Sequence, residues 1–164
     1  MSTTDGWTWP EDASKFNIAF SAVDDFNAAN ATTIKKAVHF TDNTTLWLAG
    51  LFSENNITNY DIIGISFYPE WSNFTNLSQL GNLITTLKTT YNKDVMIFET
   101  GVPWTTSNSD SYSNIINTYG NLSYPISPQG QKQFFSDLTT TVYNAGGKGV
   151  LYWEPDWISS SLCD

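Results

Sequence analysis

Short apolar runs alternate with helical patterns along the chain, and this alternation restricts the possible folds more than any other feature. The apolar runs cover residues 34–40, 61–68, 95–99 and 149–154. Near-continuous apolar strands of this kind are typical of a parallel sheet whose faces are covered by helices. The sequence therefore predicts an α/β fold with about four parallel strands and flanking helices.

Helical patterns fill the segments between these runs. Pro10, Glu11 and Asp12 mark a helix N-terminus, because proline and acidic side chains are favoured in the first turn. Further helical patterns cover residues 46–52 and 77–91. The last helix is predicted to begin with Ser127 as its N-cap and Pro128 at its first position, and to end before a Gly-Gly pair at 146–147. A chain of 164 residues with this pattern is expected to form a single domain.

Composition and charge exclude several classes of partner. Sixteen acidic and seven basic residues give a net charge of −9, which repels nucleic acids and anionic membranes but not a neutral, hydroxyl-rich substrate. No apolar run is long enough to span a membrane. Cys163 is the only cysteine, which excludes an intrachain disulfide and a cysteine-based metal site. Without an EF-hand-like or His-rich cluster, we expect neither a metal nor a cofactor.

Aromatic residues make up 15% of the chain, and several tryptophans stand beside Pro, Gly or acidic residues near predicted strand ends. Their flat apolar faces with a polar edge suit the stacking of sugar rings. The ordinary alternative is that most of them pack in the core, as tryptophans usually do. The tryptophans in these positions are Trp7, Trp9, Trp71, Trp104, Trp153 and Trp157.

Polar and aromatic side chains follow each predicted strand. Because the carboxyl ends of parallel strands meet at one edge of a sheet, we expect these side chains to face one crevice. Each has an ordinary alternative, such as a structural hydrogen bond for the histidine or a solvated turn for an acidic residue. The residues are His39 with Asp42, Tyr68 with Glu70, Glu99, and Trp153 with Glu154.

Glu99 is the leading candidate for catalysis. It ends the apolar run 95–99, and a carboxylate at the tip of a buried parallel strand is costly to desolvate and occupies the position of catalytic residues in barrels. The alternative is a strand-end glutamate that caps the next segment. Glycoside hydrolysis needs a second carboxylate, about 5–5.5 Å away in retaining enzymes. Glu154 could supply it from its strand-end position, and Glu70 and Glu11 are weaker options.

At these residues the chain resembles the endo-β-1,4-galactanases of glycoside hydrolase family 53. The matching segments run in family order over nearly the whole chain, and their combination is specific although no single segment is. They are Gly-Trp-Thr-Trp-Pro (6–10), Ala-Val-His-Phe-Thr-Asp-Asn (37–43), Asp-Ile-Ile-Gly-Ile-Ser-Phe-Tyr-Pro (61–69), Phe-Glu-Thr-Gly-Val-Pro (98–103), Ser-Pro-Gln-Gly-Gln (127–131) and Tyr-Trp-Glu-Pro-Asp-Trp (152–157).

The resemblance implies that residues 1–164 form one half-barrel, strands five to eight of a TIM (β/α)8 barrel. It implies that Glu99 is the nucleophile and that Tyr68 donates a hydrogen bond to it. Trp153 would lie under the sugar in the cleavage subsite. His39 and Asp42 fall in a motif that lines the cleft, although the spacing between them differs slightly from the family form. Trp104 and Glu154 complete the expected substrate-binding residues.

The chain departs from the family at its start. There the family places its general acid/base, the Glu of an Asn-Glu pair that precedes the Gly-Trp-Thr-Trp-Pro segment. Residues 1–5 read Met-Ser-Thr-Thr-Asp instead. The resemblance therefore implies the nucleophile half of a retaining site that acts on β-1,4-galactan, with little or no activity in the isolated chain. Its exposed strand edges predict a homodimer or a complex with the missing N-terminal half.

The family implies an extracellular or periplasmic protein. No signal peptide is visible at Met1, and Asn-x-Ser/Thr sequons at six positions, Asn30, Asn43, Asn56, Asn73, Asn76 and Asn121, are weak evidence for secretion in so Asn- and Thr-rich a chain. Two alternatives stay open. One is a galactan-binding remnant without catalysis. The other is a flavodoxin-like domain, which the lack of a phosphate-binding Gly-rich loop after the first strand disfavours.

Overall fold

The structure, a computed structural model, describes residues 8–9, 11–108 and 111–154 and contains one parallel sheet. Trp7, Trp157 and Cys163 lie outside the described residues. The predicted alternation of helices and strands is confirmed. The elements are α1 (Glu11–Asn30), β1 (Ala37–Thr41), α2 (Thr45–Glu54), β2 (Ile62–Ser66), α3 (Leu77–Tyr91), β3 (Asp94–Glu99) and α4 (Pro128–Asn144).

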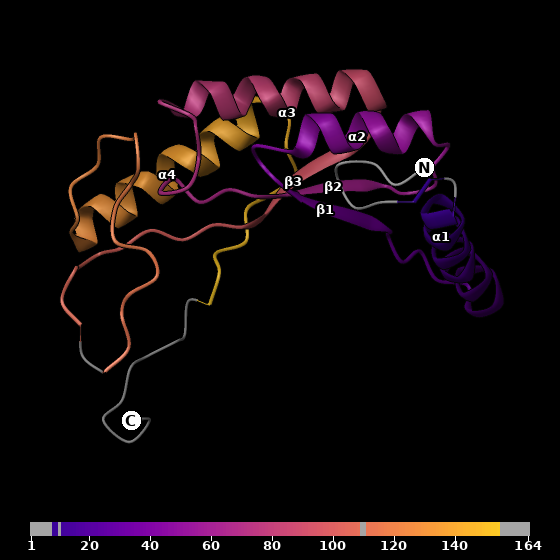
Figure 1. Cartoon of the computed structure of the whole chain (residues 1–164), viewed down its shortest axis with the longest axis horizontal. Helices are drawn as coiled ribbons and strands as arrows, with labels where there is room; N and C mark the ends of the chain where they lie inside the picture. Colours follow the sequence, from indigo (N-terminus) through magenta and orange to yellow (C-terminus); the bar gives the residue numbers. More distant parts are fainter. Residues whose placement is uncertain (1–7, 10, 109–110, 155–164) are drawn as a thin grey trace.

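The helices α2, α3 and α4 lie on the same face of the sheet, as Figure 1 shows. Neighbouring strands follow chain order, β1-β2-β3. A flavodoxin-like domain has helices on both faces and reverses its strand order. One-sided helices and sequential strands are the arrangement of a (β/α)8 barrel wall. The chain therefore forms part of a barrel, and the flavodoxin-like alternative is wrong.

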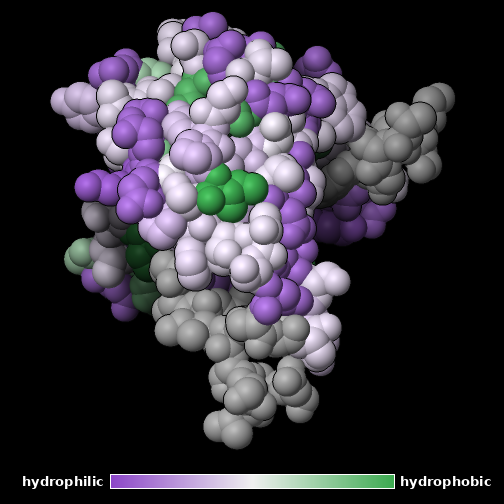
Figure 2. All heavy atoms as spheres, turned by 90° about the vertical axis from the view of Figure 1, so that its left-hand side faces the viewer, coloured by the Kyte–Doolittle hydropathy of each residue, from purple (hydrophilic) through white to green (hydrophobic). Residues whose placement is uncertain are grey.

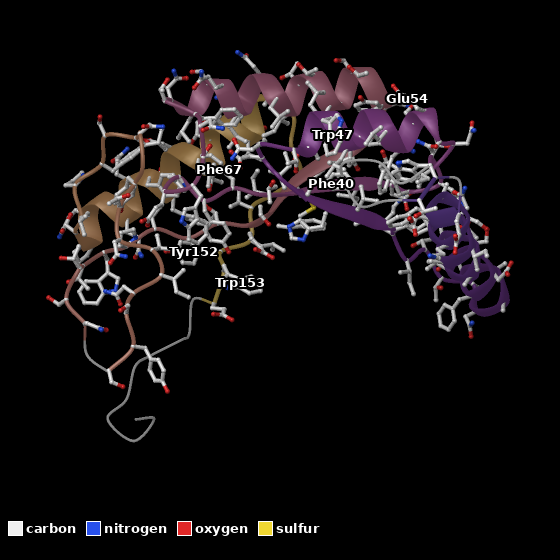
Figure 3. The ribbon with its side chains drawn as sticks, in the orientation of Figure 1. Phe40, Trp47, Glu54, Phe67, Tyr152 and Trp153 are labelled. Carbon is white, nitrogen blue, oxygen red and sulfur yellow. The ribbon has the colours of Figure 1, made fainter. Side chains whose placement is uncertain are left out.

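Alternate side chains of the strands face opposite sides of the sheet. Ile63, Ile65 and Ile97 point toward the helices and are fully buried. Phe67, directly after β2, is also fully buried, and Phe40 packs edge-on against Phe52 of α2 at a centroid distance of 5.2 Å (Figure 3). The strand residues that alternate with these lie on the other side, which no helix in the described part of the chain covers. We call this side the open face.

The carboxyl ends of the strands and the loops that follow them lie together at one edge of the molecule. The long loop 102–127 is at the left of Figure 1, and Figure 2 shows the molecule from that side. Most of this surface is of intermediate hydropathy, with few strongly hydrophobic patches. The predicted N-cap of α4 is confirmed: the Ser127 hydroxyl accepts a hydrogen bond of 3.0 Å from the N–H of Gly130.

Strand β1 begins at Ala37, three residues later than the predicted run. The side chain of Asn27, near the end of α1, both accepts a hydrogen bond from the Ile34 N–H and donates one to the Ile34 carbonyl. The Lys36 N–H donates to the Asp61 carboxylate. These side chains form hydrogen bonds with backbone groups of Ile34 and Lys36 that strand pairing would otherwise use. The strand therefore begins only at Ala37.

The predicted fourth strand, 149–154, is only partly formed. Within the described residues it makes a single parallel bridge, Val150 to Ile97. Backbone hydrogen bonds continue beside β3, since Leu151 donates to Ile97 and Trp153 donates to Thr100. Glu154 then adopts a left-handed backbone conformation with φ of 48°, which ends the extended segment. Three strands and one parallel extended segment therefore replace the four predicted strands.

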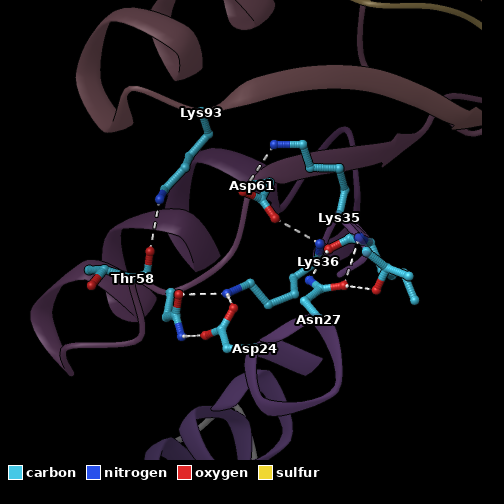
Figure 4. A network of polar contacts seen from close by, with 10 residues as sticks. Asp24, Asn27, Lys35, Lys36, Thr58, Asp61 and Lys93 are labelled. Atoms are coloured by element: carbon cyan, nitrogen blue, oxygen red, sulfur yellow. Dashed lines mark hydrogen bonds and ion pairs between the residues drawn. The ribbon is translucent and has the colours of Figure 1, made fainter. Parts of the chain in front are cut away.

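A network of polar contacts joins α1 to the amino ends of β1 and β2 (Figure 4). The Lys36 ammonium is buried, with the residue only 9% exposed, and donates to Asp24 at 2.6 Å and to Asn59 at 2.7 Å. Asn59 in turn donates to the other oxygen of Asp24. A buried charge is stable only when paired in this way, so Lys36 fixes α1 against the sheet.

No described helix is long and apolar enough to cross a membrane.

Removing the Lys36 ammonium should destabilise the fold. Lys36→Ala leaves Asp24 and Asn59 without their donor, and we expect it to lower the free energy of unfolding by about 1–3 kcal/mol in urea denaturation. Lys35→Ala is the matched control, because Lys35 and Asp61 form a largely exposed ion pair worth at most about 1 kcal/mol. Equal losses for the two variants would contradict this role of Lys36.

Candidate active site

A β-bulge at the end of β3 places two consecutive side chains on the open face. Ile65 of β2 pairs with Ile97, but the next residue, Ser66, pairs with Glu99, so Phe98 is the extra residue. The Phe98 ring lies against Gly64 so closely that a Cβ at Gly64 would be 2.2 Å from it. The bulge therefore turns Glu99 to the same side as Phe98.

Glu99 and Tyr68 are in direct contact. The Tyr68 hydroxyl donates a hydrogen bond of 3.1 Å to Oε2 of Glu99, and both residues are half-buried. Burial, and after it the negative charge of Glu99, raises the pKa of Tyr68 well above its ordinary value. Tyr68 therefore stays protonated at neutral pH and serves as the donor in its hydrogen bond to Glu99.

His39 lies on the open face beside this pair. Its Nε2 is 2.8 Å from the Ser66 hydroxyl, and its ring meets the Phe98 ring edge-on at 5.3 Å. Ser66 and Phe98 were not among the predicted site residues. Gly64 in the middle of an apolar strand is the sequence signal that could have indicated them, because such a glycine often marks a bulge or a close approach.

Asp42 follows β1 as predicted, but its carboxylate points into the protein. The residue is 8% exposed, and its side chain accepts a hydrogen bond from the Ser72 hydroxyl. Burial raises the pKa of Asp42 above its usual value. The neighbouring Asn43 donates to the backbone carbonyl of Trp71. In the structure Asp42 thus supports the turn that carries Trp71, and its contact with substrate stays a prediction.

Three exposed tryptophans lie on the segments that follow the strands, each on a different segment. Trp71 lies next to Tyr68, with 5.2 Å between the ring centroids. Trp104 is exposed on the loop after β3. The Trp153 N–H donates to the carbonyl of Thr100, the residue after Glu99.

The contacts of Tyr152 determine the side on which the Trp153 side chain lies. The Tyr152 hydroxyl points away from the open face, where it contacts the Val102 backbone and accepts a hydrogen bond of 2.9 Å from Gln131 of α4. Because adjacent residues of an extended chain point to opposite sides, Trp153 lies on the open side, as Figure 3 shows. Gln131 and Tyr152 therefore position Trp153, the residue predicted to lie under the sugar.

Glu154 lies at the rim of the site. Its side chain is exposed, and its charge contributes to the raised pKa of Tyr68. The structure thus brings Glu154 to the same region as Tyr68 and Glu99, and its contact with substrate stays a prediction. Within the described residues, no group of three or more His, Cys, Asp or Glu side chains could hold a metal ion.

The loops after the strands carry no basic residue. Segments 42–44, 67–76 and 100–127 contain neither lysine nor arginine. Lys35, Lys36 and Lys93 lie instead near the opposite edge, where the strands begin (Figure 4). In the described part of the chain, the site therefore presents carboxylates, hydroxyls and aromatic rings but no lysine or arginine that would bind an anionic group.

Comparison with known proteins agrees with this geometry. The family model of glycosyl hydrolase family 53 matches residues 2–164. The chain belongs to this family. It is 38% identical over 154 residues to the arabinogalactan endo-β-1,4-galactanase of Cellvibrio japonicus, covering 93% of this chain and 41% of that protein. It is 35% identical to the endo-β-1,4-galactanase of Bacillus subtilis, covering 92% and 35% respectively.

Solved structures show the same fold. The catalytic domain from Ignisphaera aggregans superposes with a TM-score of 0.72 and 31% identity over 85% of this chain and 39% of that domain. A fungal β-1,4-galactanase superposes with a TM-score of 0.57 and 25% identity over 74% and 38%. This family 53 chain therefore spans about two-fifths of the length of these relatives and forms part of their barrel.

The close approach of Gly64 and Phe98 can be tested by substitution. Gly64→Ala places a Cβ inside the Phe98 ring, and we expect a loss of about 1–3 kcal/mol of unfolding free energy, because overpacking forces neighbours to shift. Gly50→Ala in α2 is the control. Its Cβ would make an ordinary 3.5 Å contact, and alanine favours a helix by about 0.5–1 kcal/mol. A stable Gly64→Ala protein would contradict the packing described.

Proposed function

We propose that this chain carries the nucleophile half of a retaining endo-β-1,4-galactanase site, on strands five to eight of the barrel. The observation that carries the proposal is the Tyr68–Glu99 hydrogen bond at the carboxyl ends of β2 and β3, with exposed Trp71 beside Tyr68 and exposed Trp153 hydrogen-bonded to the residue after Glu99. Membership of family 53 and the names of the bacterial relatives support the substrate class. Residues 1–164 form a single half-barrel in this proposal.

The reaction follows from the position of Glu99. One oxygen of its carboxylate attacks the anomeric carbon of a galactose unit as the bond to the leaving oxygen breaks. A carboxylic acid from the part of the barrel outside this chain protonates that oxygen. Water then cleaves the glycosyl-enzyme ester. Tyr68 directs the carboxylate through its hydrogen bond, so the pair is aligned before substrate binds.

The surroundings of Glu99 suit a neutral polysaccharide. The loops after the strands lack basic residues, so they would not favour an acidic sugar or a phosphate. Trp153 would stack under the sugar at the cleavage position. His39, Asp42, Trp104 and Glu154 would line the remainder of the cleft. An extracellular or periplasmic location fits a polysaccharide substrate such as pectic arabinogalactan.

The open face is the reason to expect a partner. Met96, Phe98 and Leu151 lie on or beside it, and in a closed barrel such side chains fill the interior. We therefore propose that a second copy of the chain or the N-terminal half of the barrel covers this face. The second candidate function, galactan binding without cleavage, uses the same exposed tryptophans and would need no acid. Binding without bond breakage in a complete barrel would favour it.

Substitution of the nucleophile tests the proposal. Glu99→Gln keeps the shape of the side chain but removes its nucleophilic oxygen. In an assembly that cleaves β-1,4-galactan, we expect turnover, measured by release of reducing ends, to fall by several orders of magnitude while galactan binding survives. Glu54→Gln, on the exposed surface of α2, is the control. Near-normal turnover of the Glu99 variant would show that another residue is the nucleophile.

The isolated chain should hydrolyse galactan at most marginally. General acid catalysis contributes about 10²–10⁴-fold to the rate, and the proposed acid lies outside this chain. Adding a polypeptide with the first four strands and their Asn-Glu pair should restore activity and give a complex visible in light scattering. Robust cleavage by a monomer of this chain, abolished by Glu154→Gln, would instead make Glu154 the acid.

A further inference from the structure

The long loop after β3 returns to the turn after β2 and is held there by one carboxylate. Oε2 of Glu70 accepts hydrogen bonds from two consecutive backbone N–H groups, at 2.5 Å from Asn117 and 3.2 Å from Thr118. Hydrogen bonds to a charged acceptor are the stronger kind. Glu70 thus uses one of its oxygens to fix the loop.

Packing around Glu70 extends the same contact. Gly120 has a left-handed φ of 57°, and a Cβ there would lie 1.9 Å from the Pro69 carbonyl oxygen. Asn121 donates to the Ser72 carbonyl at 3.4 Å. Residues 117–121 therefore lie along residues 69–72, the turn that directly follows Tyr68.

The fixed loop lies near the ring of Tyr68. A Cβ at Gly101 would be 3.5 Å from the Tyr68 ring and 3.6 Å from the Ile116 side chain, so these two groups lie on the same side of Gly101. Ile116 directly precedes the first residue that Glu70 binds. On another side, Trp71 stands 5.2 Å from the Tyr68 ring. The surroundings of Tyr68 thus depend on where the loop is held.

We propose that Glu70 is a positioning residue for the Tyr68–Glu99 pair. By binding the backbone of Asn117 and Thr118, it keeps the loop against the Tyr68 ring and fixes the direction in which the hydroxyl meets Glu99. This inference rests on the proposed function, in which Glu99 is the nucleophile. In this proposal Glu70 positions Tyr68. It is not the second carboxylate of the reaction, for which the sequence made it one of the weaker candidates.

Chemical nitration of Tyr68 tests the positional effect without any need for activity. Tetranitromethane nitrates exposed tyrosines, and peptide mass spectrometry reads the rate at Tyr68. We expect Glu70→Ala to release the loop and speed nitration of Tyr68 several-fold. Glu70→Gln keeps an oxygen that accepts both N–H groups, so its rate should stay near that of the unsubstituted chain. Glu54→Ala, on exposed α2 (Figure 3), is the matched control.

A double-substitution cycle then tests the effect on the nucleophile. A 2,4-dinitrophenyl 2-deoxy-2-fluoro-β-galactoside needs no acid, because dinitrophenolate leaves unprotonated as the bond from Glu99 to the anomeric carbon forms. We expect Glu70→Ala to slow this labelling roughly tenfold, since small misplacements of reacting groups are costly. In a Tyr68→Phe background the same change should have no further effect, because the two residues act as one unit.

Two results would overturn the proposal. One is an unchanged rate of Tyr68 nitration in Glu70→Ala. The other is an equal slowing of labelling by Glu70→Ala with and without Tyr68. If the unsubstituted chain is never labelled at Glu99 even with the first half of the barrel present, the proposed function fails, whereas the nitration rates still decide whether Glu70 positions Tyr68.

Discussion

The site depends on the close packing of the Phe98 ring against Gly64 at the end of the sheet. A regular strand would place Phe98 and Glu99 on opposite faces, and Glu99 would point among the helices. The bulge instead places both side chains on the open face. The Phe98 ring fills the space beside Gly64, which has no side chain, and Glu99 lies on the same side as Phe98. Only then can Tyr68, which follows the neighbouring strand β2, reach the Glu99 carboxylate.

The two edges of the sheet have separate tasks. At the amino ends of the strands, the buried Lys36 ammonium joins α1 to the sheet through Asp24 and Asn59. At the carboxyl ends, the turn after β2 and the loop after β3 hold each other through Glu70 and surround Tyr68. The Lys36 network thus lies at the opposite edge of the sheet from the residues proposed to act in catalysis, and in (β/α)8 barrels the edge opposite the active site usually serves stability.

Local patterns predicted much of this fold, and long-range contacts explain what they missed. The apolar runs gave the parallel sheet, and Ser127 gave the start of α4, because these signals lie within a few residues. The start of β1 was misjudged because its pairing competes with the distant side chains of Asn27 and Asp61. The buried position of Asp42 depends on Ser72, thirty residues away, which no periodicity reveals. Strand-end reasoning did bring Glu99 and Tyr68 together.

The role of Glu99 as the nucleophile is tested most directly by the location of a trapped glycosyl group. After reaction with the fluorinated galactoside, trypsin should release residues 94–132 as one peptide, because Lys93 and Lys132 bound it and no basic residue lies between. We expect a mass increase of one fluorogalactosyl group on this peptide, with fragmentation that places it on Glu99. A label on another residue, or none when the first half of the barrel is present, would contradict it.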